Sequence, residues 1–257
     1  MFQAGLGLDK HFDVRNLDYR IKDVVPLNDD LSALAVAAAR TSLDVDTPAV
    51  RGLVETPTAR YCNDSAWWGD QGDTPHCTAY ALLHAMADGA VTHPGQNPLA
   101  DPTELYDAIV RRDRAANRWF PAGATSLAMA QEAVARRWIG EFRWGYTLDE
   151  FIAPLLRGEP VLLGIDWPDG MDEPSKEGIV RWRGRNRGGH EIEANGINLR
   201  RGLARLKQSW DRRTYGLNGH VYIPLEDVAA AIAAQGDVLL FRELRTDDPR
   251  TRRDESK

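Results

Sequence analysis

Apolar residues follow a helical period in the first part of the chain, up to about residue 157. Capping signals mark the helix ends. Thr74 followed by Pro75 favours a helix start, because Thr is a good N-cap and Pro suits the first helical position. Gly158 favours a helix end. The pattern predicts helices over residues 30–42, 75–89, 102–112, 125–137 and 148–157.

The pattern changes to short apolar runs after residue 159. The run PVLLGIDW, residues 160–167, is bounded by Pro and Gly and is typical of a buried strand. Further strands are predicted over 190–199, 203–210, 220–223 and 237–241, with a short helix over 225–234. Helices first and strands later predict an α+β fold with a helical lobe and a sheet lobe.

The two ends of the chain differ from the middle. Residues 1–55 are polar apart from the Ala-rich helix, and we assign them to an N-terminal extension. The Pro- and Thr-containing stretch 46–59 is interpreted as a linker or an extended strap. Residues 56–243 form the main domain, and the charged tail 244–257 lacks apolar residues and is expected to be disordered.

Composition narrows the class of protein. Of the 257 residues, 43% are hydrophobic and 27% charged, as in soluble globular proteins, and the net charge of −6 argues against a nucleic-acid binder. No apolar run is long enough to cross a bilayer, and the N-terminus lacks the features of a signal peptide, so we expect a cytoplasmic protein without a membrane partner. Two cysteines cannot form a disulfide framework.

The loop WGDQGDTPHC leads directly into the predicted helix over 75–89, with Cys77 near its start. If Thr74 is the N-cap, Cys77 is the third helical residue, where free N–H groups and the helix dipole favour an anion. A thiolate is such an anion and is the nucleophilic form of cysteine. Taken alone, a cysteine is more often a small buried apolar residue, and Cys62 is interpreted in that way.

Three other side chains could complete a site around Cys77. His190 follows two glycines and opens a strand on which it shares a face with Ile192. Gln208 stands just before Trp210, and its amide could accept the imidazole N–H while the indole excludes water. Gln71 precedes Cys77 in the same loop and could donate to an oxyanion beside the Cys77 backbone N–H.

Four motifs, in this order along the chain, resemble those of the papain-like cysteine peptidases. They are Gln71-Gly72 with Cys77 after four further residues, the turn PAGAT around Gly123, Gly189-His190 opening a strand, and Gln208-Ser209-Trp210 followed by Tyr215-Gly216 and Asn218-Gly219. The resemblance covers roughly residues 58–243. Each motif alone is weak, and the ordered set is specific.

The resemblance implies a papain-like two-lobe fold, with a helical lobe, an antiparallel barrel-like β lobe and a cleft between them. It implies a cysteine peptidase with Cys77 as nucleophile, His190 as base, Gln208 as the orienting amide and Gln71 in the oxyanion hole. It also implies that Gly123, Ala124, Gly189 and Trp210 line the cleft, and that a peptide or protein is the substrate. Neither a cofactor nor a metal is expected.

The sequence departs from the family pattern at several of these positions. Gln208 stands where the family has Asn, Asp211 replaces Gly, and Tyr215 replaces the second Trp. Glu191 and Glu193 follow His190 where the family usually has small apolar residues. The N-terminal extension shows no match to the usual inhibitory propeptide helices.

Other functions stay open. The scaffold could bind a peptide without catalysis, as the changes at Gln208 and Asp211 suggest, or could catalyse isopeptide cleavage or transamidation. The alternating arginines of residues 181–187 resemble a single-strand nucleic-acid contact, but we interpret them as a solvated hairpin; an anionic peptide is another possible target. A zinc site built on Cys62 and Cys77 lacks the paired short spacings of zinc ligands.

Overall fold

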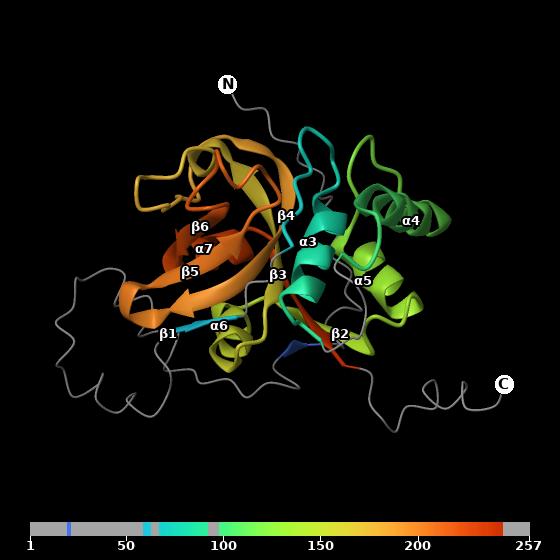
Figure 1. Cartoon of the computed structure of the whole chain (residues 1–257), viewed down its shortest axis with the longest axis horizontal. Coiled ribbons are helices and arrows are strands. Elements are labelled where there is room, and N and C mark those ends of the chain that lie inside the picture. Colours follow the sequence, from blue (N-terminus) through green and yellow to red (C-terminus); the bar gives the residue numbers. More distant parts are fainter. Residues whose placement is uncertain (1–19, 22–58, 63–66, 92–97, 244–257) are drawn as a thin grey trace.

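The computed structural model describes residues 20–21, 59–62, 67–91 and 98–243. The helix predicted over 30–42, most of the predicted strap and the tail 244–257 lie outside these residues. Figure 1 shows helix α3 lying alongside strands β3 and β4, with helices α5 and α4 farther from the sheet. The predicted α+β class is confirmed.

The sheet has seven antiparallel strands in the order β2-β7-β3-β4-β5-β6, with β1 paired to β4. The barrel-like prediction is wrong, because in the described part of the chain β2 and β6 are the outermost strands and do not pair with each other, so the sheet does not close. The strands are β1 Ala59–Tyr61, β2 Glu141–Gly145, β3 Val161–Pro168, β4 Asn186–Asn198, β5 Leu203–Lys207, β6 His220–Pro224 and β7 Asp237–Arg242.

The predicted helices that fall within the described residues are present with small shifts at their ends. Asp101 caps α4 by accepting from the backbone N–H groups of Thr103 and Glu104, both at 3.0 Å, and Thr125 caps α5. Gly158 ends α6 in the left-handed region, with φ 83°, as predicted. The helices are α3 Cys77–Ala87, α4 Pro102–Ala115, α5 Ser126–Ala135, α6 Leu148–Arg157 and α7 Leu225–Ala233.

Strands β1 and β2 were not predicted. β1 has only three residues, which is too short for a pattern to appear. β2 lies between helices, and its partner β7 follows it by about a hundred residues in the chain. The pairing of these two segments therefore depends on long-range contacts that no local pattern reports.

Both faces of the sheet are buried, which explains the continuous apolar run of β3. Leu162 on one face belongs to a core shared with α3, α4 and α5. Its neighbours Val161 and Leu163 point to the other face and join the core beneath α6 and α7. The sheet thus separates a helical side from a second helix-covered side.

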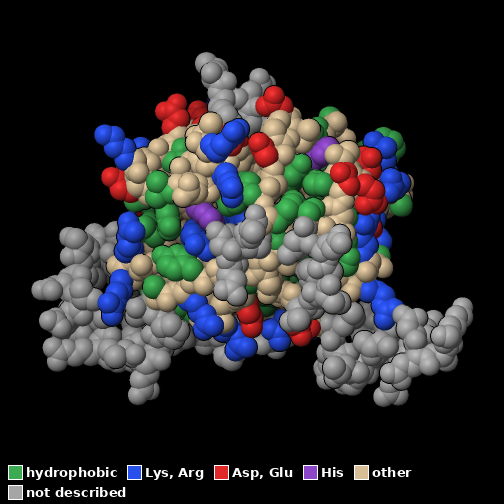
Figure 2. Space-filling model, in the orientation of Figure 1, with side chains coloured by type: hydrophobic (Ala, Val, Ile, Leu, Met, Phe, Trp, Pro, Cys, Tyr) green, Lys and Arg blue, Asp and Glu red, His purple; other side chains and the backbone are tan. Residues whose placement is uncertain are grey.

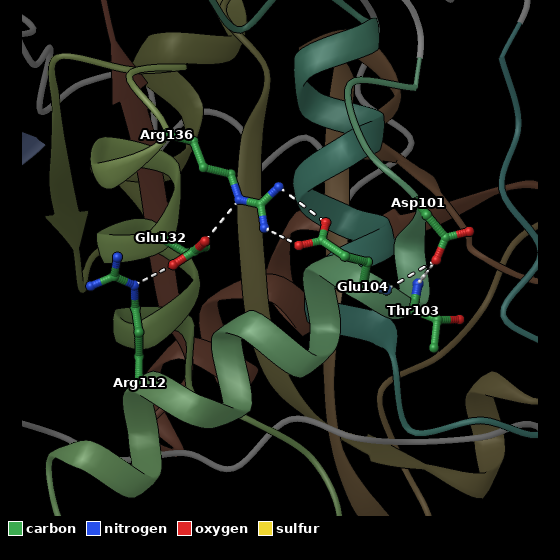
Figure 3. A network of polar contacts seen from close by, with 6 residues as sticks. All are labelled: Asp101, Thr103, Glu104, Arg112, Glu132 and Arg136. Atoms are coloured by element: carbon green, nitrogen blue, oxygen red, sulfur yellow. Dashed lines mark hydrogen bonds and ion pairs between the residues drawn. The ribbon is translucent and has the colours of Figure 1, made fainter.

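Charged side chains hold the two outer helices of the helical side together (Figure 3). Arg136, after α5, donates to Glu104 of α4 and to Glu132 of α5, each at 2.7 Å, and Arg112 of α4 donates to Glu132. The shared Glu132 carboxylate is buried, so its two pairs fix the register of α4 against α5.

A fully buried ion pair joins helix α3 to the sheet. Asp88, the C-cap of α3, accepts from the Lys207 ammonium at 2.7 Å and from the Asn195 amide at 2.8 Å. Both charged side chains have no solvent exposure. The bonds fix the end of α3 relative to β4 and β5.

We expect Asp88→Asn to lower the free energy of unfolding by about 3 kcal/mol, because it leaves the Lys207 ammonium buried without its counter-charge. Urea denaturation measures the change. Asp211→Asn is the matched control: it breaks an ion pair whose arginine is 84% exposed, so the urea midpoint should change little. Equal midpoints for Asp88→Asn and wild type would contradict the expectation.

Candidate functional site

Helix α3 begins at Cys77, whose side chain is fully buried. The prediction that Thr74 is the N-cap is wrong: His76 occupies that position, and the Thr74 hydroxyl instead donates to the Gln71 carbonyl at 2.6 Å. Cys77 is therefore the first helical residue and not the third. Because the first N–H groups of a helix have no intrahelical acceptor, the residue still lies at the positive end of the helix dipole.

His190 lies near the start of β4 and is completely buried. Its Nε2 is 2.7 Å from the Gln208 side-chain oxygen, which also accepts from the Ser209 backbone N–H at 2.9 Å. Since an amide oxygen can only accept, Nε2 carries the proton and Nδ1 has the lone pair. Nδ1 is buried and has no hydrogen-bond partner among the described residues.

Burial lowers the pKa of His190 from its ordinary value of 6.5 to about 4, against the opposing effect of the Gln208 hydrogen bond. The ring is therefore neutral at pH 7 in this structure. A neutral imidazole whose Nδ1 is unprotonated is a proton acceptor, so the geometry provides a base rather than a preformed imidazolium.

Cys77, at the start of α3, and His190, near the start of β4, lie at similar distances from the bond that joins these two elements. The Asp88–Asn195 bond joins the far end of α3 to the middle of β4. From there back to Cys77 the helix rises roughly 16 Å, and from Asn195 back to His190 the strand spans roughly 16 Å. Because the Gln71 N–H donates to the Ser209 carbonyl at 2.8 Å near the start of α3, the two elements run in the same direction.

Gln71 is held in the loop that leads to Cys77 and is 2% exposed. Its side-chain oxygen accepts from the Ser209 hydroxyl, and its amide nitrogen donates to the Thr74 carbonyl at 2.7 Å. An amide nitrogen carries two hydrogens, and this bond accounts for one of them. The two bonds therefore hold the Gln71 side chain between the Ser209 hydroxyl and the Thr74 carbonyl, close in the chain to Cys77.

The turn around Gly123 is attached to the start of α3 by a residue that the sequence analysis missed. The Gly123 backbone N–H donates to the Tyr106 hydroxyl at 2.9 Å, and the following Ala124 is fully buried. The Tyr106 ring stacks on His76 with centroids 4.1 Å apart. Tyr106 lies in a predicted helix and has no motif around it, so only its position between the turn and α3 identifies it.

Two tryptophans enclose the imidazole. The Trp167 ring meets that of His190 edge-on with centroids 4.9 Å apart, and the Trp210 ring lies at 5.4 Å. Trp210, predicted to line the cleft, is only 2% exposed, so its ring packs inside the protein beside the imidazole. Gly189, the fourth residue predicted to line the cleft, pairs with Asp166 across β3 and β4 and is half-buried.

The acidic residues after His190 lie on the opposite face of β4. The predicted alternation is present, since Ile192 belongs to the core beneath α6. Glu191 is also fully buried and accepts from the Ser126 hydroxyl of α5 at 2.7 Å. Burial, with the nearby Asp237 carboxylate, holds the pKa of Glu191 well above its usual range. These glutamates therefore belong to the interface between the sheet and the helices.

Within the described residues, no three His, Cys, Asp or Glu side chains are grouped as metal ligands. In the same part of the chain, every helix is too short or too polar to span a bilayer.

The fold resembles solved cysteine proteases, although no family model and no curated protein matches the sequence. Xylellain, a cysteine protease from Xylella fastidiosa, matches with TM-score 0.66 at 13% identity, over 95% of this chain and 98% of xylellain. The cysteine protease CMS1MS2 of Carica candamarcensis, solved in complex with E-64, matches with TM-score 0.53 at 16% identity. The match covers 74% of this chain and 100% of that protein.

Procathepsin B S9 of Trypanosoma congolense also has TM-score 0.53, at 10% identity, over 91% of this chain and 86% of its own. The structural neighbours are thus papain-like cysteine proteases. At these identities the likeness establishes the fold, and the activity has to be argued from the site.

The lowered pKa of His190 predicts a loss of stability in acid. Between about pH 6.5 and 4 the unfolded chain binds a proton at this residue that the folded protein does not, so the free energy of unfolding falls as the pH falls. The loss from this group totals about 3 kcal/mol and stops below pH 4. Urea midpoints at pH 7, 5.5 and 4 measure it.

His190→Asn is the comparison for that experiment. The variant lacks the titrating ring, so its stability should fall less than that of wild type between pH 6.5 and 4. If both proteins lose stability in parallel over this range, His190 is not buried in its neutral form.

Proposed function

We propose that this chain, which has the fold of the papain-like cysteine proteases, is a cysteine peptidase of residues 56–243 that cleaves peptide bonds through Cys77 and His190. The observation that carries the proposal is the arrangement of the imidazole. Gln208 holds the Nε2 proton and Nδ1 keeps its lone pair in a buried position. The bonds from Asp88 to Asn195 and from Gln71 to Ser209 support a position of Cys77 beside this ring. A thiol at that helix end would have both a base and a favourable dipole.

Acylation begins when His190 Nδ1 takes the proton of the Cys77 thiol as the sulfur attacks the substrate carbonyl. A carbon–sulfur bond forms, and the carbonyl electrons move to the oxygen. The Cys77 backbone N–H and the Gln71 amide donate to this oxyanion. His190 then gives its proton to the amide nitrogen, the carbon–nitrogen bond breaks and the amine leaves.

Deacylation repeats the transfers with water. Nδ1 removes a proton from water as its oxygen attacks the thioester, and the carbon–sulfur bond breaks to release the acid. The proton returns from His190 to the sulfur, which restores the starting state. The imidazolium exists only while an anionic sulfur or tetrahedral adduct lies beside it, which is consistent with a ring whose pKa is low in the resting protein.

Cys77→Ala should abolish peptide hydrolysis and also prevent labelling by an epoxide-type thiol probe. The substitution removes the only nucleophile of the proposal and, at a fully buried position, changes the packing by a single atom. Fluorogenic peptide hydrolysis and mass spectrometry of the labelled protein measure the two effects. Cys62→Ala is the matched control: burial raises the pKa of its thiol to about 12, so it should neither label nor affect turnover. Equal labelling of Cys77→Ala and wild type would refute the assignment.

Gln208→Ala should lower kcat by roughly tenfold to a hundredfold, because the acceptor that fixes the His190 tautomer is lost. KM should change little, since Gln208 is buried behind the imidazole. Gln131→Ala, an exposed position on α5, is the control and should have wild-type kinetics. An unchanged kcat in Gln208→Ala would mean that the amide does not orient the base.

The same assays separate the alternatives. Peptide binding by both wild type and Cys77→Ala with no hydrolysis by either would indicate a catalytically silent scaffold. Transfer of the acyl group to added amines in preference to water would indicate transamidation.

The arginine-rich segment 181–187 has internal partners that support the structural interpretation. Arg181 pairs with Glu226 and Asp227 of α7, and Arg187 pairs with Asp172. Figure 2 shows basic and acidic side chains interspersed over the visible face. We therefore propose a peptide or protein, rather than a nucleic acid, as the ligand.

A further inference from the structure

An open pocket of about 340 Å³ lies next to the proposed catalytic residues. Two loops form it, one directly before Gln71 and one directly after Trp210. Its volume is at the lower end of the range for small-molecule and side-chain sites. Its lining consists of Trp67, Trp68, Asp70, Asp211, Arg212 and Arg213.

The pocket walls are rigidly connected to the site. The Trp68 indole N–H donates to the Trp210 carbonyl at 3.1 Å, and its ring meets that of His220 edge-on with centroids 5.2 Å apart. A Cβ at Gly219 would lie 2.0 Å from the Trp68 ring, so the close packing of this wall requires glycine. The pocket is therefore preformed.

The charges in the lining are not equivalent. Arg213 donates to both Asp211 carboxylate oxygens at 3.0 Å, and its pKa is raised by Asp211 and, more weakly, by Asp70. Asp70 also accepts from the Gly72 backbone N–H. Arg212 is exposed and has no ion-pair or hydrogen-bond partner among the residues that the structure describes. Its guanidinium is thus available to an anion, whereas Arg213 is paired with Asp211 and Asp70 accepts one backbone N–H.

The position of the pocket determines which part of a peptide it meets. The leaving amine has to receive its proton from His190, so the leaving side of the substrate lies nearest His190 and the Trp210 ring that packs on it. The Gly123 turn is attached to the start of α3 through Tyr106 and His76, and none of these residues lines the pocket. A peptide that passes the turn and places its carbonyl near Gln71 therefore continues over the pocket.

We propose that this pocket binds the leaving side of the substrate and that Arg212 selects a carboxylate there. The carboxylate is either an Asp or Glu side chain or the C-terminus of a short peptide. A guanidinium presents a planar set of donors that matches a carboxylate, and the two tryptophans provide apolar contact to the rest of that residue. The proposal rests on the proposed peptidase function and adds the substrate class.

The kinetic test uses peptides that differ in one carboxylate. In the first pair, both peptides have an amidated C-terminus and differ in having Glu or Gln in the leaving part. In the second pair, both have Gln and differ in having a free or an amidated C-terminus. Arg212→Ala should raise KM roughly fivefold for the peptides with a leaving-side carboxylate and leave their kcat unchanged. Neither KM nor kcat should change for the neutral peptides. The pair that responds identifies the source of the carboxylate. Arg183→Ala, an exposed arginine outside the pocket lining, makes the same charge change and should have no effect.

A binding test does not require turnover. Short acidic peptides matching the leaving part should bind Cys77→Ala, measured by calorimetry, and the affinity should fall roughly fivefold in Arg212→Ala and decrease with added salt. Arg212→Lys, which keeps the charge without the planar donor set, should bind with intermediate affinity. The proposal is overturned if Arg212→Ala changes acidic and neutral peptides equally, or if Arg183→Ala has the same effect. If no peptide is hydrolysed but the carboxylate-dependent binding persists, the peptidase proposal fails and the pocket proposal stands.

Discussion

The contact between helix α3 and strands β4 and β5 is the constraint on which the rest of the structure depends. α3 is attached at both ends, through Asp88 to Lys207 and Asn195, and through Gln71 to Ser209. A helix rises about half as far per residue as a strand, so the two attachment points determine which residues meet between them. Cys77 and His190, which are far apart in the chain, reach the same level because of this geometry. The buried ion pair is costly to desolvate, but it specifies a single register for the contact.

The burial of His190 favours the neutral ring as a proton acceptor and disfavours the charged ring. The tryptophans that protect its hydrogen bond to Gln208 also remove the ring from water, which lowers its pKa and keeps it neutral. A neutral ring with a fixed tautomer is well suited to accept a proton from a thiol. In the proposed mechanism, the imidazolium depends on the anion that forms beside it, so protonation of His190 accompanies the chemistry and does not precede it.

The residues that depart from the pattern of the papain-like peptidases have defined partners in this structure. Gln208 is one methylene longer than the expected Asn, yet its oxygen lies 2.7 Å from the imidazole and is fixed by the Ser209 N–H. Asp211 replaces a glycine and orients Arg213 at the edge of the pocket. Glu191 lies on the face of β4 that points to α5, so its carboxyl does not compete with the imidazole. Each of these three substituted side chains thus makes a hydrogen bond within the protein.

The sequence by itself determined the helices and most strands of the described residues, because caps and periodicity are local signals, and its ordered motifs selected the four residues of the proposed site. It placed the end of α6 at Gly158 correctly, where a positive φ favours glycine. It misplaced the start of α3, since the Thr74 hydroxyl bonds to Gln71 instead of capping the helix. Only the tertiary structure decided that the sheet stays open and that β2 pairs with β7. It also decided that Tyr106 connects the Gly123 turn to α3. Likewise, only the structure shows that Arg213 has a partner while Arg212 lacks one among the described residues. These outcomes depend on contacts between residues distant in the chain, whose energies no local pattern contains.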